Sequence, residues 1–137
     1  MSTDADREKL KRGYEMWAAG DPAAVEYFLD LVADDVDWKS LGDGRPGMEF
    51  SRTRKGKGEV LGYFQDIASK WKLVNYHVEA IVSEGDRHIV ICDCAWKHSD
   101  TGKVVETPKI DTYRMKDGII TEFREYYDTA KTAEATI

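Results

Sequence analysis

The chain has 137 residues and a net charge of −6; 42% of its residues are hydrophobic and 34% are charged. This length suits one domain with a hydrophobic core of its own, so we expect residues 1–137 to form a single domain. The acidic balance argues against a nucleic-acid partner, and no run approaches the roughly 18 apolar residues of a membrane span. The opening "MSTDADREKLKRG" holds no apolar signal core, which predicts a cytoplasmic protein.

Two helices are predicted at the start of the chain. The first covers residues 4–19, and the sequence "AAGD" ends it at Gly20. Its apolar stripe consists of Leu10, Tyr14 and Trp17. Asp21 is expected to cap the second helix, with Pro22 at its first helical position.

The next elements are a strand, a long irregular segment and a third helix. Alternating residues predict a short strand over 35–41. Residues 42–57 are rich in glycine and arginine, and an irregular segment of this length is often a lid or a binding loop. Its basic stretch "SRTRKGKG", residues 51–58, is interpreted as a solvated loop, with an anion site as the alternative. The third helix is predicted over 58–71.

Strands dominate the remainder of the chain. Four are expected, over 73–83, 87–98, 103–116 and 119–128, and they are joined by short turns. Helices followed by an antiparallel meander predict the α+β class. We expect a curved antiparallel sheet wrapped by the three helices, which gives a cone with a pocket that is open at one end.

The two cysteines, Cys92 and Cys94, are two residues apart on one predicted strand. Both side chains therefore point to the same side, and a disulfide between them would need strained geometry. A metal pair is conceivable, but no further Cys or His stands at ligand spacing. We interpret them as small core residues in a reducing compartment.

The last hairpin, "PKIDTYRMKDGIITEFREYYD", places charged residues where a sheet face should be apolar. A two-residue turn at Asp117-Gly118 and a three-residue loop over 116–118 are both plausible. The longer loop separates apolar from charged residues far better, so we favour it. Its inner face would carry Lys109, Asp111, Tyr113, Met115, Ile119, Thr121, Phe123, Glu125 and Tyr127.

This register places three charges on the core side, with Lys109 opposite Glu125 and Asp111 diagonal to it. Isolated buried charges cost several kcal/mol, so such groups pair, shift their pKa or line a wet cavity. One interpretation is a structural ion pair between Lys109 and Glu125. The other is a pocket floor with a titratable pair, in which one carboxylate raises the pKa of the other.

The segments "AAGD", "LVADDVDW" and "KIDTYRMKDGIITEFREYYD", in this order, resemble the nuclear-transport-factor-2-like superfamily. The chain is most similar to its SnoaL-like polyketide cyclase and ketosteroid isomerase branch. The resemblance implies a bent sheet wrapped by three helices around an apolar pocket, and a homodimer formed through the outer sheet face.

The resemblance also bears on individual residues. Asp111 matches the protonated aspartate in the oxyanion hole of ketosteroid isomerases, an enzyme for which neutral aspartate is an established example. Ser40 stands where the isomerases have their proton-abstracting aspartate, and Gly13 stands where they have their oxyanion tyrosine. Tyr14 follows one position later. Limonene epoxide hydrolase is similar as well, and Glu125 matches one of its catalytic aspartates.

We therefore predict Asp111 as general acid or base, Glu125 as the group that keeps Asp111 protonated or as a second base, and Lys109 as counter-ion or oxyanion stabiliser. The expected substrate-binding residues are Tyr14, Trp17, Trp38, Ser40, Phe64, Cys92, Cys94, Trp96, Tyr113, Phe123 and Tyr127. His77, His88 and His98 are expected at the surface, and no metal or cofactor is predicted.

The predicted function is acid/base chemistry on a small hydrophobic, oxygenated molecule, by an isomerase, cyclase, dehydratase or hydrolase. Two alternatives stay open. The same fold could be a non-catalytic ligand-binding or dimerisation module, or it could hydrolyse epoxides in the manner of limonene epoxide hydrolase with a rearranged site.

Overall fold

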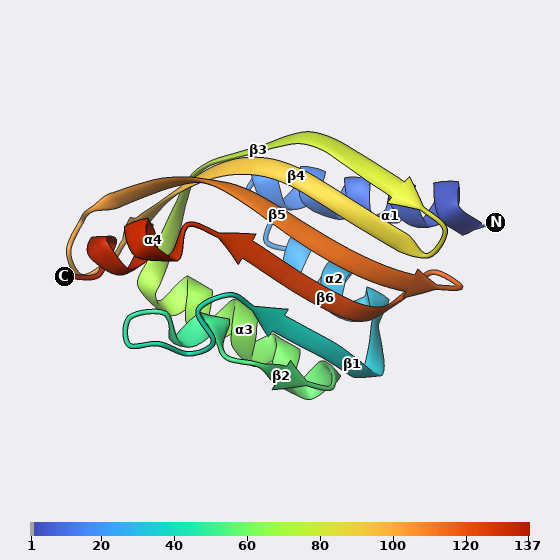
Figure 1. Cartoon of the computed structure of the whole chain (residues 1–137), viewed down its shortest axis with the longest axis horizontal. Helices are drawn as coiled ribbons and strands as arrows, with labels where there is room; N and C mark the ends of the chain where they lie inside the picture. Colours follow the sequence, from blue (N-terminus) through green and yellow to red (C-terminus); the bar gives the residue numbers. More distant parts are fainter. Residues whose placement is uncertain (1) are drawn as a thin grey trace.

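The computed structural model describes the backbone of residues 2–137 and the side chains of residues 3–137. Four α-helices, a short 3₁₀ helix and six strands occur in this part of the chain (Figure 1). In order they are α1 (Ser2–Ala18), α2 (Ala24–Leu31), β1 (Val32–Ser40), η1 (Glu49–Ser51), β2 (Arg54–Lys55), α3 (Lys57–Lys70), β3 (Trp71–Glu84), β4 (Arg87–His98), β5 (Val104–Lys116), β6 (Ile119–Tyr127) and α4 (Thr129–Ala135).

The strands form one curved sheet in the order β2-β1-β6-β5-β4-β3. Strands β3 to β6 make the predicted antiparallel meander. Strand β1, however, pairs with β6 in parallel, so the sheet is mixed. The expected α+β class is confirmed, and the purely antiparallel sheet is corrected, because the long crossover between β1 and β6 is invisible in local sequence patterns.

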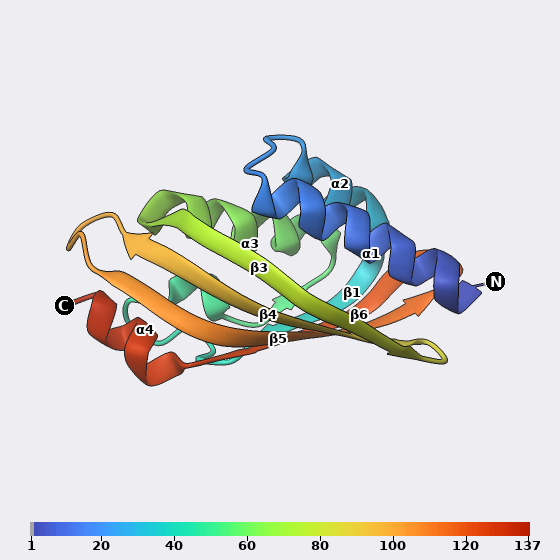
Figure 2. The ribbon, with the colours of Figure 1, turned by 90° about the horizontal axis from the view of Figure 1, so that it is seen from above.

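Helices α1, α2 and α3 lie on one face of the sheet (Figure 2). They contribute Leu10, Phe28 and Val60 to a core that continues into Val90 and Ile120 of the strands. Full burial of one such side chain contributes roughly 1.5–3 kcal/mol. Within the described residues, no helix is long and apolar enough to cross a membrane.

Helix α2 begins later than predicted. The Asp21 side chain accepts a hydrogen bond from the Ala23 amide at 2.9 Å, and its carbonyl accepts one from Ala24 at 3.0 Å. These bonds build a turn that precedes the helix. Helix α4 was not predicted, although Asp128 caps it by accepting a hydrogen bond from the Lys131 amide at 2.9 Å. A carboxylate at this position is an ordinary helix-start signal.

The basic stretch over 51–58 is not a wholly solvated loop. Arg54 is buried, and its guanidinium lies 2.6 Å from the Asp66 carboxylate of α3. This ion pair connects β2 with α3, and the same guanidinium lies 3.5 Å from the Glu49 and Phe50 carbonyls of η1. The prediction for two histidines is also wrong, because His88 and His98 are buried.

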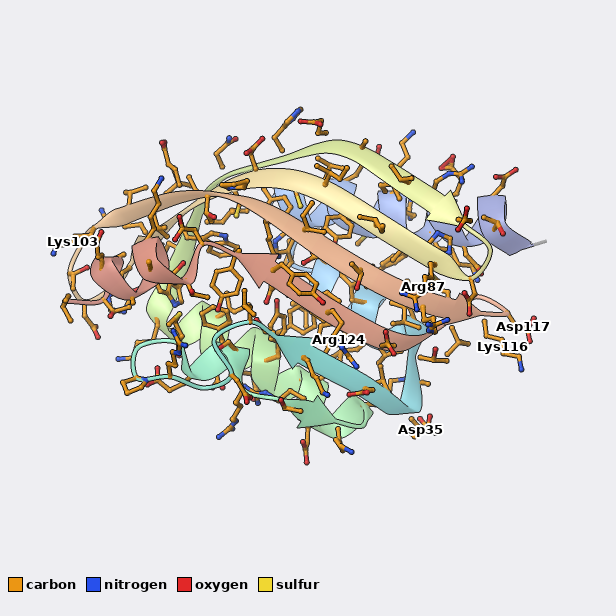
Figure 3. The ribbon with its side chains drawn as sticks, in the orientation of Figure 1. Asp35, Arg87, Lys103, Lys116, Asp117 and Arg124 are labelled. Carbon is orange, nitrogen blue, oxygen red and sulfur yellow. The ribbon has the colours of Figure 1, made fainter. Side chains whose placement is uncertain are left out.

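The β5–β6 turn is the two-residue alternative. Asp117 and Gly118 have φ of 52° and 81°, which fits a tight hairpin turn, and Lys116 pairs with Ile119. A bulge then shifts the register, so that Ile120 faces the core while Ile119 and Thr121 face outward. The favoured three-residue loop was therefore wrong, yet the bulge restores the predicted orientation from residue 123 onward. Lys116 and Asp117 point away from the body (Figure 3).

Candidate active site

Three charged side chains of β5 and β6 point into the protein. Lys109 and Asp111 are two residues apart on β5 and so share a face, and Asp111 lies directly opposite Glu125 on β6. Lys109 is opposite Tyr127 and not opposite Glu125, which corrects the predicted pairing. Asp111 is 1% exposed and Glu125 is 4% exposed. The sequence prediction that all three face inward is confirmed.

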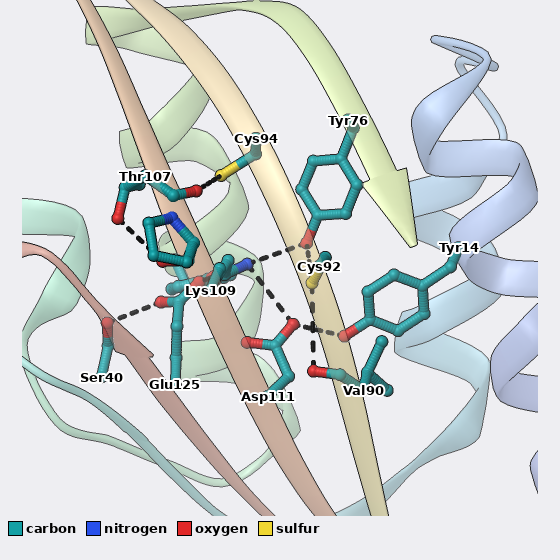
Figure 4. Close-up of polar contacts among 12 residues, drawn as sticks. Tyr14, Ser40, Tyr76, Val90, Cys92, Cys94, Thr107, Lys109, Asp111 and Glu125 are labelled. Atoms are coloured by element: carbon teal, nitrogen blue, oxygen red, sulfur yellow. Dashed lines mark hydrogen bonds and ion pairs between the residues drawn. The ribbon is translucent and has the colours of Figure 1, made fainter. Parts of the chain in front are cut away.

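The Lys109 ammonium lies between the two carboxylates (Figure 4). Its Nζ is 2.7 Å from Glu125 Oε2 and 3.4 Å from Asp111 Oδ2. It also donates a hydrogen bond to the Tyr76 hydroxyl at 3.1 Å. The single Lys109 ammonium thus forms ion pairs with both carboxylates, and the contact with Glu125 is the shorter one.

Glu125 has hydrogen-bond partners on both of its oxygens. Ser40 Oγ donates to Oε1 at 2.6 Å, and the Tyr63 hydroxyl donates to Oε2 at 2.8 Å. Together with Lys109, these donors come from β1, α3 and β5. Glu125 is therefore a fully satisfied buried acceptor, as buried carboxylates require.

In the part of the chain that the structure describes, only one of the two carboxylate oxygens of Asp111 has hydrogen-bond partners. Its Oδ2 accepts a hydrogen bond from the Tyr14 hydroxyl, which lies 2.8 Å from the Tyr113 hydroxyl. Its Oδ1 is buried and has no hydrogen-bond partner among the described residues. An orphaned carboxylate oxygen in a native interior calls for an explanation, and an open position for a ligand or a proton is one.

The surroundings change the pKa of these groups. Burial raises the pKa of Asp111 to about 6; Lys109 opposes this rise and Glu125 adds to it. Burial acts to lower the pKa of Lys109, but the Asp111 and Glu125 carboxylates outweigh it and raise the pKa well above its ordinary value. Burial also raises the pKa of Tyr14 well above its usual range. A buried carboxyl with a raised pKa is a candidate for acid/base chemistry, and Asp111 meets this description.

Two neighbouring cavities lie beside the cluster. The cavity lined by Thr132 of α4, called the outer cavity, has about 500 Å³ of unfilled space, and the cavity lined by Tyr14 of α1 and Phe28 of α2, called the inner cavity, has about 330 Å³. Both volumes include space that is open to solvent. Both cavities are lined by Trp17, Tyr63 and Lys109. Glu125 lines the outer cavity and Asp111 the inner one, so Lys109 stands where the two cavities meet.

Most of the predicted wall residues do line these cavities. The outer cavity contains Trp17, Cys94, Trp96 and Tyr127, and the inner cavity contains Tyr14, Trp17, Trp38, Phe64, Tyr113 and Phe123. Ser40 and Cys92 line neither. The Ser40 hydroxyl is bound to Glu125, and the Cys92 thiol lies 3.6 Å from the Tyr76 hydroxyl. Both cysteines are buried free thiols.

Tyr14 reaches Asp111 although the resemblance placed the oxyanion tyrosine at Gly13. A Cβ at Gly13 would lie 2.5 Å from the Phe28 ring, so a larger residue there would force α1 and α2 apart. The next position supplies the hydroxyl instead.

Several lining residues were missed by the sequence analysis. They are Phe50, Tyr63, Ile67, Trp71, Tyr76, Val105, Thr107 and Thr132, besides Phe28. Tyr63 carried a usable signal, because it is three residues after Val60 and four before Ile67 on the buried side of α3. Phe50 lies in the three-residue helix η1, which is too short for a periodic pattern to identify its buried side.

Comparison with known proteins places this chain in a family. The family model described as the SnoaL-like domain matches residues 10–123. No curated protein matches the chain.

Solved structures show the same fold. An NTF2-like protein of unknown function from Burkholderia pseudomallei has a TM-score of 0.83 at 17% identity, over 96% of each chain. A protein from Mesorhizobium loti described as a candidate SnoaL-like polyketide cyclase has 0.70 at 26% identity, over 88% of this chain and 97% of its own. A protein with a ketosteroid isomerase-like fold from Catenulispora acidiphila has 0.75 at 15% identity, over 94% of this chain and 92% of its own. The chain belongs to the SnoaL-like domain family, within the NTF2-like fold.

Proposed function

We propose that the protein is a cofactor-independent enzyme that transfers a proton on a small, hydrophobic, oxygenated molecule. The observation that carries this proposal is the buried Asp111 carboxyl, whose Oδ1 has no partner in the described structure and whose side chain lines the inner cavity. The SnoaL-like fold family includes polyketide cyclases and isomerases, which agrees with such chemistry.

The roles follow from the contacts. Oδ1 of ionised Asp111 takes a proton from a carbon next to a carbonyl group, and the electron pair of the broken C–H bond moves to the carbonyl oxygen. The Lys109 ammonium lines both cavities and stabilises the negative charge on that oxygen. Asp111 then returns the proton to another atom of the ligand, which completes an isomerisation or a ring closure without oxidation or reduction. Glu125 keeps Lys109 in place at 2.7 Å.

Proton exchange on carbon tests the proposal without knowledge of the natural substrate. The protein is incubated with a panel of apolar cyclic ketones and enones in D₂O, and deuterium uptake next to the carbonyl is followed by mass spectrometry. Asp111→Asn should lower the exchange rate about a hundredfold or more, since general acid/base groups contribute about 10²–10⁴-fold.

Asp93→Asn is the matched control, because Asp93 is an exposed aspartate on the neighbouring strand β4. It should exchange at the wild-type rate. Equal exchange by wild type and Asp111→Asn would remove Asp111 from the mechanism. Ketones that bind without any exchange would favour the ligand-binding module instead.

A further inference from the structure

The outer cavity has a second polar end, opposite in character to the charged cluster. Its walls are mostly aromatic or aliphatic. Besides the charged Lys109 and Glu125 and the hydroxyls of Tyr63 and Tyr127, the lining includes the hydroxyls of Thr107 on β5 and Thr132 on α4. Both threonines are buried, at 6% and 4% exposure. Thr107 lies within residues 10–123, the part that matches the family model, and helix α4 with Thr132 lies beyond it.

The hydrogen atoms of both hydroxyls are already used. Thr107 Oγ1 donates to the Pro108 carbonyl at 2.7 Å and accepts a hydrogen bond from the Asp128 amide at 3.0 Å. Thr132 Oγ1 donates to the Asp128 carbonyl at 2.8 Å, and no described residue donates to it. A hydroxyl has one donor and two acceptor positions, so what remains at this end is acceptor capacity, most of it on Thr132.

Asp128 holds the two threonines together. Its amide binds Thr107, its carbonyl binds Thr132, and its side chain caps α4 (Figure 1 shows α4 directly after β6). The acceptor pair is thereby fixed relative to β5. Thr107 and Lys109 are two residues apart on the same face of β5, which separates them by about 7 Å (Figure 4).

We infer that Thr132, with Thr107, forms a recognition site for a hydrogen-bond donor on the ligand, in the outer cavity that Lys109 also lines. The ligand class is a compact cyclic ketone or enone that carries a hydroxyl or N–H group on the side remote from its carbonyl. Aromatic walls such as Trp96 and Tyr127 contact the ring between the two polar ends. The inference rests on the proposed function for the placement of the carbonyl alone.

Two probes that differ by a single hydroxyl test this inference by calorimetric titration. They are tetralone and its analogue with a hydroxyl para to the carbonyl. Wild type should bind the hydroxylated probe several-fold to about tenfold more tightly, which corresponds to one hydrogen bond. Thr132→Val replaces the hydroxyl by a methyl group of the same shape and should make the two affinities equal.

Thr132→Ser keeps the hydroxyl and should restore the preference, which a merely structural role of Thr132 would not produce. Thr129→Val, on the same helix but outside the cavity lining, should leave the preference at its wild-type value. Thermal unfolding shows whether each variant is folded.

Either of two results overturns the inference: wild type shows no preference for the hydroxylated probe, or Thr132→Val retains the preference. The affinity ratio does not depend on turnover. Preferential binding without deuterium exchange would therefore contradict the proposed chemistry and leave the recognition site standing.

Discussion

The buried Asp111 carboxyl should make the stability of the protein depend on pH in a way that Asp111→Asn abolishes. Burial raises the pKa of this group from 3.8 to about 6. Between these values the unfolded chain has released the proton that the folded protein still holds. Folding then takes up a proton, so the free energy of unfolding falls as the pH rises through this window.

The size of the effect follows from the same shift. The difference between about 6 and 3.8 is about 2 pKa units, and each unit corresponds to about 1.4 kcal/mol, which gives roughly 3 kcal/mol. The full stabilisation is present below pH 3.8 and is lost above pH 6. Asparagine has the same shape and does not titrate, so Asp111→Asn lacks this loss.

The measurement is urea unfolding of wild type and Asp111→Asn at intervals from pH 3.5 to pH 7. The difference wild type minus variant cancels the other titrating groups to first order and should fall by roughly 3 kcal/mol across the range. Asp93→Asn, at an exposed aspartate of β4, serves as the control for the substitution itself. A flat or rising difference for Asp111→Asn would refute the assignment of a raised pKa to this carboxyl.

Three further predictions concern the packing of α3, the hydrogen bond of Tyr14 and the oligomeric state. Gly62→Ala should destabilise the protein in chemical unfolding, because the added Cβ would lie 2.5 Å from buried Arg54. The Cβ of Gly58→Ala would meet nothing within 4 Å, so this variant should stabilise α3 by up to about 1 kcal/mol. Equal effects of the two substitutions on the free energy of unfolding would contradict the packing around Gly62. Tyr14→Phe removes a hydrogen bond that lowers the pKa of the active-site aspartate, so the lower limb of the pH–rate profile for deuterium exchange should move to higher pH, and an unmoved limb would show that another group titrates. The wild-type protein is predicted to form a homodimer through the outer sheet face, so analytical ultracentrifugation should give the mass of two subunits. Ile89→Lys places a charge on an exposed apolar position of that face and should give monomers. A monomeric wild type would contradict this prediction.

The inward orientation of the charged cluster was predictable because a strand alternates its side chains without exception until a bulge occurs. The segregation of apolar and charged residues around Tyr113 and Phe123 was strong enough to identify the core face. The turn was not predictable by the same reasoning. A tight Asp117-Gly118 turn followed by a bulge at Thr121 gives almost the same pattern as the three-residue loop over 116–118.

Long-range pairing was beyond local patterns. The parallel contact of β1 with β6 joins residues such as Ser40 and Glu125, which are 85 positions apart, and nothing within either segment specifies the partner. This pairing affects the chemistry of the site, because it places the Ser40 hydroxyl where it donates a hydrogen bond to Glu125. The sequence had suggested a cavity wall for Ser40 instead. Helix α4 was missed for a different reason. Its local signal, the Asp128 cap, was present in the sequence, but the predicted strand over 119–128 included this residue.

The unequal sharing of hydrogen-bond donors explains how two buried carboxylates have different roles. With both ionised, the cluster carries one net negative charge, because Lys109 supplies one positive charge to Asp111 and Glu125. Glu125 takes the shorter contact to Lys109, at 2.7 Å against 3.4 Å, together with the Ser40 and Tyr63 hydroxyls. The uncompensated charge therefore falls on Asp111, whose Oδ1 has no donor among the described residues, and protonation there removes the surplus. Burial is the largest cause of the raised pKa of Asp111, and the nearby Glu125 charge adds to it. The Asp111 side chain lines the inner cavity, where the proposed mechanism takes up a ligand proton.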